Sequence, residues 1–291
     1  MPINFDGVIV SLLTPMNEDY CVDFFGLKNL CARLLNKGVE NFLILGDYSE
    51  QNFLDYSFQK KIIVSASREL KNKGNLVVGC FSDSSEEIIE KVKFAEKYCE
   101  YCLVNIPFNA LTNEVEFIDF FDNLFTRTKS KIILYNNPSS FKRNIPINGL
   151  NRIVGWERLI GIFDNSKNKA YFRALCDYHQ LLKIFQCFEP NVIESQNYTC
   201  AGNVSGLANV FPELFLSIKK DFEKNGYNSM LRQEIFLIRL FEKIPTEKEI
   251  QIYKKMLSVE GVVQEYFNNN LTSLSEKEFN IIQEMLKKNL A

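Results

Sequence analysis

The chain has 291 residues, a formal net charge of −2 and 46% hydrophobic residues, which is enough for one large domain with a substantial core. This balance gives no basic field to attract nucleic acid, and no apolar run reaches the ~20 residues that span a bilayer. Because the N-terminus also lacks the basic start and apolar core of a signal peptide, we expect a cytoplasmic protein with neither a nucleic-acid nor a membrane partner.

Short apolar runs alternate with amphipathic stretches along most of the chain. In chain order, the predicted strands and helices are 8–13 with 24–35, 42–45 with 55–71, 76–80 with a helix from 84, 102–106 with 114–127, 131–135 with 147–153, 159–163 with 169–177, then strand 182–186, and 203–206 with a helix opened by Pro212. Hydroxyl and carboxyl side chains at 84–87 suit a helix N-terminus, and Gly38 suits a helix end.

Near-continuous apolar strands that alternate with helices indicate a parallel sheet covered by helices. Eight such units favour closure into an α/β fold, a (β/α)₈ TIM barrel, over an open sheet. We expect residues 1–225 to form the barrel. Residues 226–291 are expected to form a C-terminal helical extension packed on it, broken near Pro245 and around 268–270, within one structural unit.

The eight cysteines predict reduced packing thiols and no metal site. Cys99 and Cys102 form a Cys-x-x-Cys pair, but a zinc or redox centre would need a second pair or nearby histidines. The single histidine, His179, lies far along the chain. We therefore expect neither a metal nor another cofactor.

The C-terminal ends of the strands, where a barrel of this kind keeps its active site, carry a series of motifs. They are Gly7 to Pro15, Leu45-Gly46-Asp47-Tyr48-Ser49-Glu50, Tyr135-Asn136-Asn137-Pro138, Gly161-Ile162-Phe163-Asp164-Asn165-Ser166 and Ser205 to Glu213. Their order and spacing resemble the dihydrodipicolinate synthase/N-acetylneuraminate lyase family of class I aldolases. The resemblance covers about the first 260 positions. The last motif leans toward the N-acetylneuraminate lyase branch.

The resemblance implies a chemistry in which a lysine on the sixth strand forms a Schiff base with pyruvate. A tyrosine after the fifth strand moves the proton, helped by hydroxyls after the second strand and by a second tyrosine from a neighbouring subunit. An arginine assists the substrate carboxylate. The family also implies a homo-oligomer, a dimer or tetramer, and a small-molecule ligand: a sugar acid, a keto acid or a neutral analogue.

This chain departs from that pattern at nearly every reacting position. The matching positions hold Tyr135 for the proton-moving tyrosine, Phe163 for the lysine, Asp47 and Tyr48 for the hydroxyls, Asn109 for the second tyrosine and Ser140 for the arginine. Framework residues remain, among them Gly206 and Asn209. Phenylalanine cannot form an imine, and the motif on either side of Phe163 fixes its register.

Three interpretations stay open. The first is a ligand-binding or regulatory pseudoenzyme, acting alone or beside an active relative, with an aromatic pocket of Tyr48, Phe108, Tyr135, Phe163 and Phe188. Asp47 and Glu189 at its rim would disfavour anionic keto acids. The second is an enzyme with new acid/base chemistry. The third is a lyase that uses an unexpected lysine. We expect Schiff-base aldolase activity to be lost.

Overall fold

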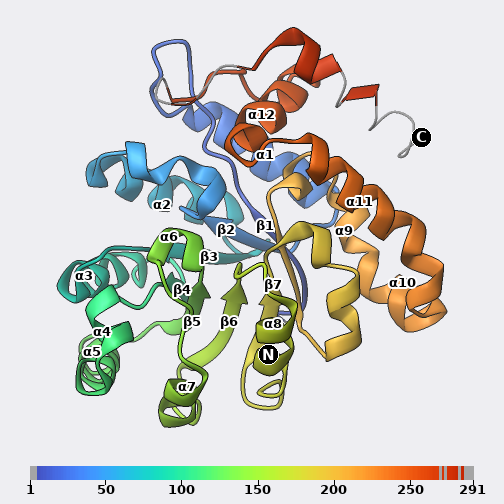
Figure 1. The fold of residues 1–291 in the computed structure, drawn as a ribbon. Coiled ribbons are helices and arrows are strands. Elements are labelled where there is room, and N and C mark those ends of the chain that lie inside the picture. The colour runs from blue at the N-terminus through green and yellow to red at the C-terminus, as the bar shows by residue number, and fades with distance from the viewer. Residues whose placement is uncertain (1–4, 269–270, 272–273, 281–282, 285–291) are drawn as a thin grey trace.

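The computed structural model describes residues 5–268, 271, 274–280 and 283–284. Its centre is a closed barrel of parallel strands in sequence order, surrounded by helices (Figure 1). The strands are β1 (Gly7–Ser11), β2 (Asn41–Ile44), β3 (Asn75–Cys80), β4 (Tyr101–Val104), β5 (Lys131–Asn136), β6 (Leu159–Asp164), β7 (Lys183–Gln186) and β8 (Gly202–Ser205). The predicted barrel is confirmed, and the predicted strand ends differ by no more than two residues.

The helices between the strands follow the amphipathic stretches of the sequence. They are α1 (Phe24–Asn36), α2 (Tyr56–Leu70), α3 (Ser85–Ala95), α4 (Phe108–Thr112), α5 (Glu114–Arg127), α6 (Pro138–Phe141), α7 (Ile147–Ile153), α8 (Lys169–Cys176), α9 (Pro212–Leu216) and α10 (Ile218–Asn225). Side-chain caps fix several starts: Asp23 accepts from the backbone N–H groups of Phe25 and Gly26 at α1. The sequence did not predict α4 and α6, because five and four residues are too short to show a helical period.

Alternation along each strand sends one set of side chains into the barrel and the other toward the helices. The inward set is mostly apolar and contains Phe5, Ile9, Leu43, Val77, Tyr101, Leu103, Ile133, Tyr135, Phe163, Phe185, Ala201 and Val204. Phe5 closes the N-terminal end of the barrel, with its ring 4.8 Å from that of Tyr101. The interior is therefore packed at the N-terminal ends of the strands, and a cavity opens at their C-terminal ends.

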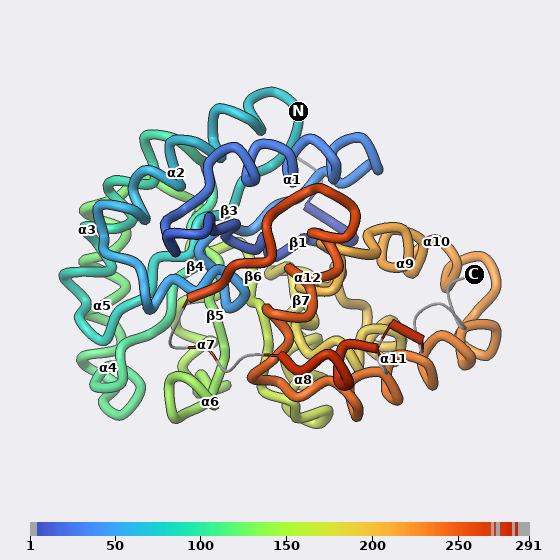
Figure 2. The backbone as a smooth tube through the Cα atoms, turned by 90° about the horizontal axis from the view of Figure 1, so that it is seen from above, coloured from blue at the N-terminus to red at the C-terminus, as the bar shows by residue number. Residues whose placement is uncertain are grey.

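The C-terminal extension lies at the end of the barrel where the strands terminate (Figures 1 and 2). It contains α11 (Leu231–Lys243) and α12 (Glu249–Val259), and the predicted break at Pro245 separates them. The second predicted break falls largely on 269–270, outside the described residues. The boundary proposed after residue 225 coincides with the end of α10 and remains a prediction.

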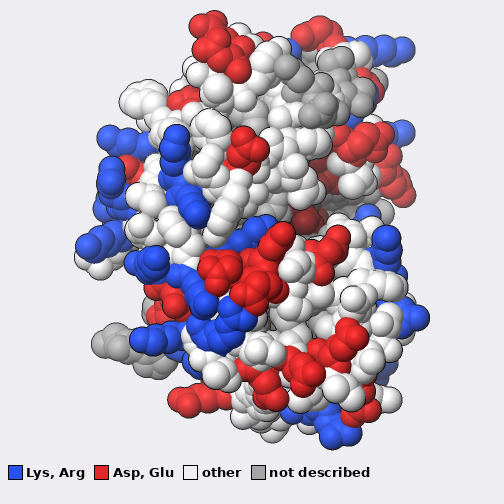
Figure 3. All heavy atoms as spheres, turned by 90° about the vertical axis from the view of Figure 1, so that its left-hand side faces the viewer, with Lys and Arg blue, Asp and Glu red and all other residues white. Residues whose placement is uncertain are grey.

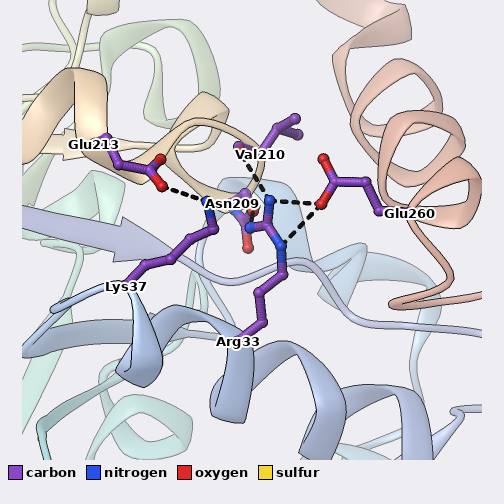
Figure 4. A network of polar contacts seen from close by, with 6 residues as sticks. All are labelled: Arg33, Lys37, Asn209, Val210, Glu213 and Glu260. Atoms are coloured by element: carbon purple, nitrogen blue, oxygen red, sulfur yellow. Dashed lines mark hydrogen bonds and ion pairs between the residues drawn. The ribbon is translucent and has the colours of Figure 1, made fainter.

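Two polar clamps hold α12 on the barrel. Lys254 forms a fully buried ion pair with Glu50, which follows β2. At the C-terminal end of the helix, Arg33 on α1 donates to the carbonyl oxygens of Asn209 and Val210 at 2.8 and 3.0 Å and to Glu260 at 2.7 Å (Figure 4). The extension is thus held to the loops that follow β2 and β8.

The molecular surface is of mixed charge on the face that bears the early helices. Lys and Arg side chains lie among Asp and Glu there (Figure 3), and Arg127 pairs with Glu86 on this side. Within the described ranges, no helix has the length and apolarity needed to cross a membrane.

Candidate functional site

A cavity of about 820 Å³ opens at the C-terminal ends of the strands. Its floor is the top of the barrel interior, where Leu43, Leu103, Phe163 and Val204 face it. Its walls come from the loops after β2, β5, β6 and β7, and from the extension through Ile238, Phe241 and Glu249. This volume suits a small organic molecule.

Phe163 lies on the floor, at the position that the family resemblance assigns to the Schiff-base lysine. It is fully buried, and its backbone pairs in register with Tyr135 on β5 and Phe185 on β7. Its ring meets that of Phe185 edge to face at 5.1 Å. Phe163 is therefore packed into the inner aromatic layer and presents only carbon to the cavity.

A polar network lies beside Phe163. The Tyr135 hydroxyl donates to Asp47, and the Asn137 amide lies 3.1 Å from that hydroxyl and 3.3 Å from the Asp47 carboxylate. Asn165 contacts the same two groups at 3.2 and 3.3 Å. Burial and the Asp47 charge hold the pKa of Tyr135 well above its usual range, so this phenol stays a donor at neutral pH.

The surrounding protein shields Asp47 from part of its hydration, and this desolvation raises its pKa. Hydrogen bonds from Tyr135, Asn165 and Asn137 oppose that rise. The Asp47 side chain is exposed to the cavity, so water reaches it. We therefore expect a charged Asp47 carboxylate at neutral pH, held in place by three side-chain donors.

A second network contains two buried carboxyl groups. Glu189 accepts hydrogen bonds from the Ser205 hydroxyl, from the backbone N–H of Leu207 at 2.9 Å and from the Tyr48 hydroxyl at 3.2 Å. Glu249, on the first turn of α12, also interacts with Tyr48. Burial raises the pKa of Glu189 to about 6; burial, followed by the Glu189 charge, raises that of Glu249 to about 8.

Lysines are scarce at this cavity. Lys167, after β6, is the one lysine among the described lining residues, and its ammonium group lies 5.3 Å from the centre of the Phe188 ring. It is exposed and lies four residues beyond Phe163, outside the strand. Lys254 is buried, but it is paired with Glu50 and does not line the cavity. Neither occupies the strand position of the family's nucleophile.

The structure brings most of the predicted site residues together. The cavity is lined by Asp47, Tyr48, Tyr135, Ser140, Phe163, Phe188 and Glu189. Gly206 and Asn209 lie behind it. The Tyr48 ring packs on Gly206 so closely that a β-carbon there would approach it to 2.4 Å. The Asn209 amide donates to the carbonyl oxygens of Ser11 and Gly206 at 2.7 and 2.8 Å, so it braces two loops.

Two predicted residues lie elsewhere. Phe108 was expected to line the aromatic pocket, but it is 43% exposed on α4, outside the cavity. Asn109, on the same helix, borders a separate hollow of about 400 Å³ with Pro107 and Arg127. The prediction for Phe108 is wrong because the loop after β4 turns outward into α4, and no residue of that helix returns to the cavity of its own chain.

Sequence reasoning missed Glu249 and Ser11 as members of this site. Glu249 arrives from the extension, and no motif or strand-end position marks it. Asn165 and Lys167 follow β6 immediately, so their position at a strand end could have found them. No group of three or more His, Cys, Asp or Glu side chains within the described ranges could hold a metal ion.

Comparisons with known proteins give a consistent result. The model of the dihydrodipicolinate synthetase family matches residues 4–289. A 4-hydroxy-tetrahydrodipicolinate synthase of Karelsulcia muelleri is 23% identical over 268 residues, which cover 90% of each chain. An N-acetylneuraminate lyase of Fusobacterium nucleatum is 22% identical and covers 97% of this chain and 98% of its own. The structure of a monomeric dihydrodipicolinate synthase variant has a TM-score of 0.90 at 20% identity. The match covers 99% of this chain and 98% of the variant's chain.

Proposed function

This chain belongs to the dihydrodipicolinate synthetase family, and from that premise we propose that it binds a small molecule in the barrel cavity without forming a Schiff base. The proposal rests mainly on Phe163. Its side chain is buried in the inner aromatic layer, where an amine would have to stand to attack a carbonyl from the sixth strand. A phenyl ring has no lone pair for imine formation.

The other departures support the same conclusion. Ser140 occupies the position of the carboxylate-binding arginine and lines the cavity, as do Asp47 and Glu189. Asp47 and Glu189 present two negative charges to a keto acid, and Ser140 lacks the positive charge of an arginine. Both differences disfavour binding of the keto acid's carboxylate. A sugar acid or keto acid is thus a poorer ligand than a neutral or positively charged molecule.

Borohydride trapping tests the absence of imine chemistry. The protein is incubated with pyruvate and sodium borohydride and its intact mass is measured, with a family member that has the strand-six lysine as positive control. We expect no mass gain on this chain. A single adduct that disappears in Lys167→Arg would instead support a lyase with a displaced lysine.

Ligand binding is tested separately by thermal denaturation. A ligand that binds only the folded chain raises the melting temperature in proportion to the logarithm of its concentration above Kd. Keto acids, sugar acids, neutral sugars and amines are screened at the same concentrations. A screen in which no compound of any class stabilises the protein would count against a binding cavity and favour an inert scaffold.

New acid/base chemistry is the second candidate function, and the two buried glutamates favour it. Carboxyl groups whose pKa values lie near neutrality, as those of Glu189 and Glu249 do, suit a general acid or base. Turnover of a compound found in the binding screen, without imine trapping and abolished in Glu189→Gln, would decide for this candidate over simple binding.

A further inference from the structure

Glu189 and Glu249 both line the cavity, both interact with Tyr48, and both are buried without a cationic partner among the described residues. They are 2% and 9% exposed, and neither forms a salt bridge with a residue of the described ranges. Tyr48 interacts with both, but its hydroxyl has one proton and can donate to only one carboxylate at a time. A second buried carboxylate with no counter-charge is costly, so we expect one of the pair to hold a proton when no ligand is bound.

The groups that act on Glu249 come from several elements. Burial, the charge of Glu189 after β7 and the charge of Asp47 after β2 raise the pKa of Glu249, whereas the Tyr48 hydrogen bond and the Lys167 charge lower it. Tyr253, one turn further along α12, stays neutral because burial and both glutamates raise its pKa well above its usual range. The site thus has more negative charge than the protein itself balances.

Two buried hydroxyl groups near this pair also lack partners within the described ranges. The Ser11 hydroxyl, 1% exposed at the end of β1, lines the cavity and has no hydrogen-bond partner there. The Tyr253 hydroxyl is equally unpaired, and its ring lies 5.9 Å from that of Tyr48. Buried polar groups are rarely left without a partner, and because the Ser11 hydroxyl lines the cavity, it points to a polar ligand group that completes the site.

The residues that line the cavity walls suit a ligand that carries a positive charge on an apolar body. The ammonium group of Lys167 already lies 5.3 Å from the centre of the Phe188 ring, a cation–π distance. Phe53, Phe241 and Ile250 line the cavity as well, so an aliphatic or aromatic body finds apolar contacts. Lys167 is exposed and has no salt bridge among the described residues, so it can move aside.

We infer that the ligand of this cavity is a small organic cation, a primary amine on an apolar body, with its ammonium group held between Glu189 and Glu249. This inference rests on the proposed function and names its ligand class. The ammonium supplies three donors and a counter-charge to the two carboxylates, which lets Glu249 give up its proton. A carboxylate ligand would instead place a second negative charge beside the one that the pair already carries.

A set of probes that share one body separates charge from shape. Benzylamine, benzyl alcohol and benzoate carry a cationic, a neutral and an anionic group on the same ring, and their binding to the full chain is measured by calorimetry and NMR. We expect benzylamine to bind about tenfold or more tightly than benzyl alcohol, as for a hydrogen bond between charged groups. Benzoate should bind most weakly.

Matched variants locate the effect. Glu189→Gln and Glu249→Gln keep the side-chain shape and remove a charge, so each should remove most of the preference for benzylamine over benzyl alcohol. Glu242→Gln is the control: it also removes a lining carboxylate, but Glu242 is exposed at the rim of the cavity. It should leave that preference unchanged, and melting temperatures check that all three variants are folded.

The pH dependence adds a second readout. Because we expect Glu249 to hold a proton in the free protein and to release it to solvent when an ammonium ligand binds, benzylamine binding should release a proton near pH 7. Its affinity should rise from pH 6 to above pH 8 and then level off while the amine stays charged. Calorimetry in buffers of different ionisation enthalpy measures this release, which should vanish in Glu249→Gln.

Each possible result supports or overturns either this inference or the proposed function. A preference for benzylamine that the two Gln variants remove supports the inference. Equal or tighter binding of benzyl alcohol or benzoate, or no binding of benzylamine, overturns it while leaving the proposed small-molecule function intact if another compound binds. Imine trapping with pyruvate, or no ligand of any class, overturns the proposed function itself.

Discussion

Phe163 shows how the residue type at one strand position determines what that position contributes to the barrel. The residue faces inward because it alternates with Ile162, which packs toward the helices in the outer core. A lysine there could react only with a substrate carbonyl oriented beside it. The phenyl ring needs only packing partners, and Phe185 and Tyr135 lie beside it in register on the neighbouring strands. Phe163 is part of the core that shapes the cavity floor.

We predict that Phe163→Ala destabilises the protein by about 3–5 kcal/mol, because a fully buried ring is removed and its neighbours refill the space only partly. Phe163→Leu keeps most of the volume and should cost less than half as much. Urea unfolding monitored by circular dichroism measures both. An Ala variant as stable as the parent would mean that Phe163 is not packed as described.

At this scale the sequence predicted several residues that follow strands and missed Glu249, which comes from the C-terminal extension. Asp47, Tyr48 and Glu189 follow β2 and β7 directly, so strand prediction alone placed them at the barrel mouth. Glu249 reaches the same cavity through the packing of α12, which no local pattern encodes. The prediction for Phe108 was wrong for a related reason, because the short helix α4 turns this side chain outward.

Among the elements, α12 decides the shape of the site. It contributes Glu249 and Tyr253 near the cavity, and its buried Lys254 holds it to Glu50 after β2. Lys254 also donates to the backbone oxygen of Tyr266 at 3.0 Å, and Glu50 accepts from the backbone of Asn268 at 2.6 Å. This pair therefore ties together three segments that are distant in sequence.

Breaking the pair from either side should be costly, because it leaves a buried charge without its partner. We predict that Glu50→Gln and Lys254→Met each destabilise the protein by about 3–5 kcal/mol, and that the double variant loses clearly less than the sum. The exposed pair Lys93 and Glu90 is the control; Lys93→Met should cost no more than about 1 kcal/mol. Additive losses in the buried pair would show that the two side chains do not depend on each other.

For the whole molecule, the alternation of apolar strands and helices predicted a parallel sheet covered by helices. The presence of eight such units favoured a closed barrel, which the structure has. The assembly of barrels with one another is a different matter, because it depends on the exposed surface. Two large apolar side chains stand out on neighbouring helices: Phe108 on α4 is 43% exposed, and Val115 on α5 is 68% exposed.

We predict a homo-oligomer, at least a dimer, in which the face of α4 and α5 is buried. In the family resemblance this is the region where a tyrosine crosses to the neighbouring subunit; here that position is Asn109, so apolar area rather than a shared catalytic group must hold the contact. Light scattering should give a mass of at least twice 33.8 kDa. Phe108→Asp should shift the protein toward the monomer, because it places a charge in the apolar contact.

Leu181→Asp is the matched control for that shift. Leu181 is 62% exposed, but it lies just before β7, where the strands begin, so its replacement should leave the mass unchanged. The pair of variants separates a specific interface from a general effect of surface charge. A parent chain that stays monomeric at tens of micromolar, or a mass that falls equally in both variants, would contradict an interface on α4 and α5 and leave the cavity to act within a single subunit.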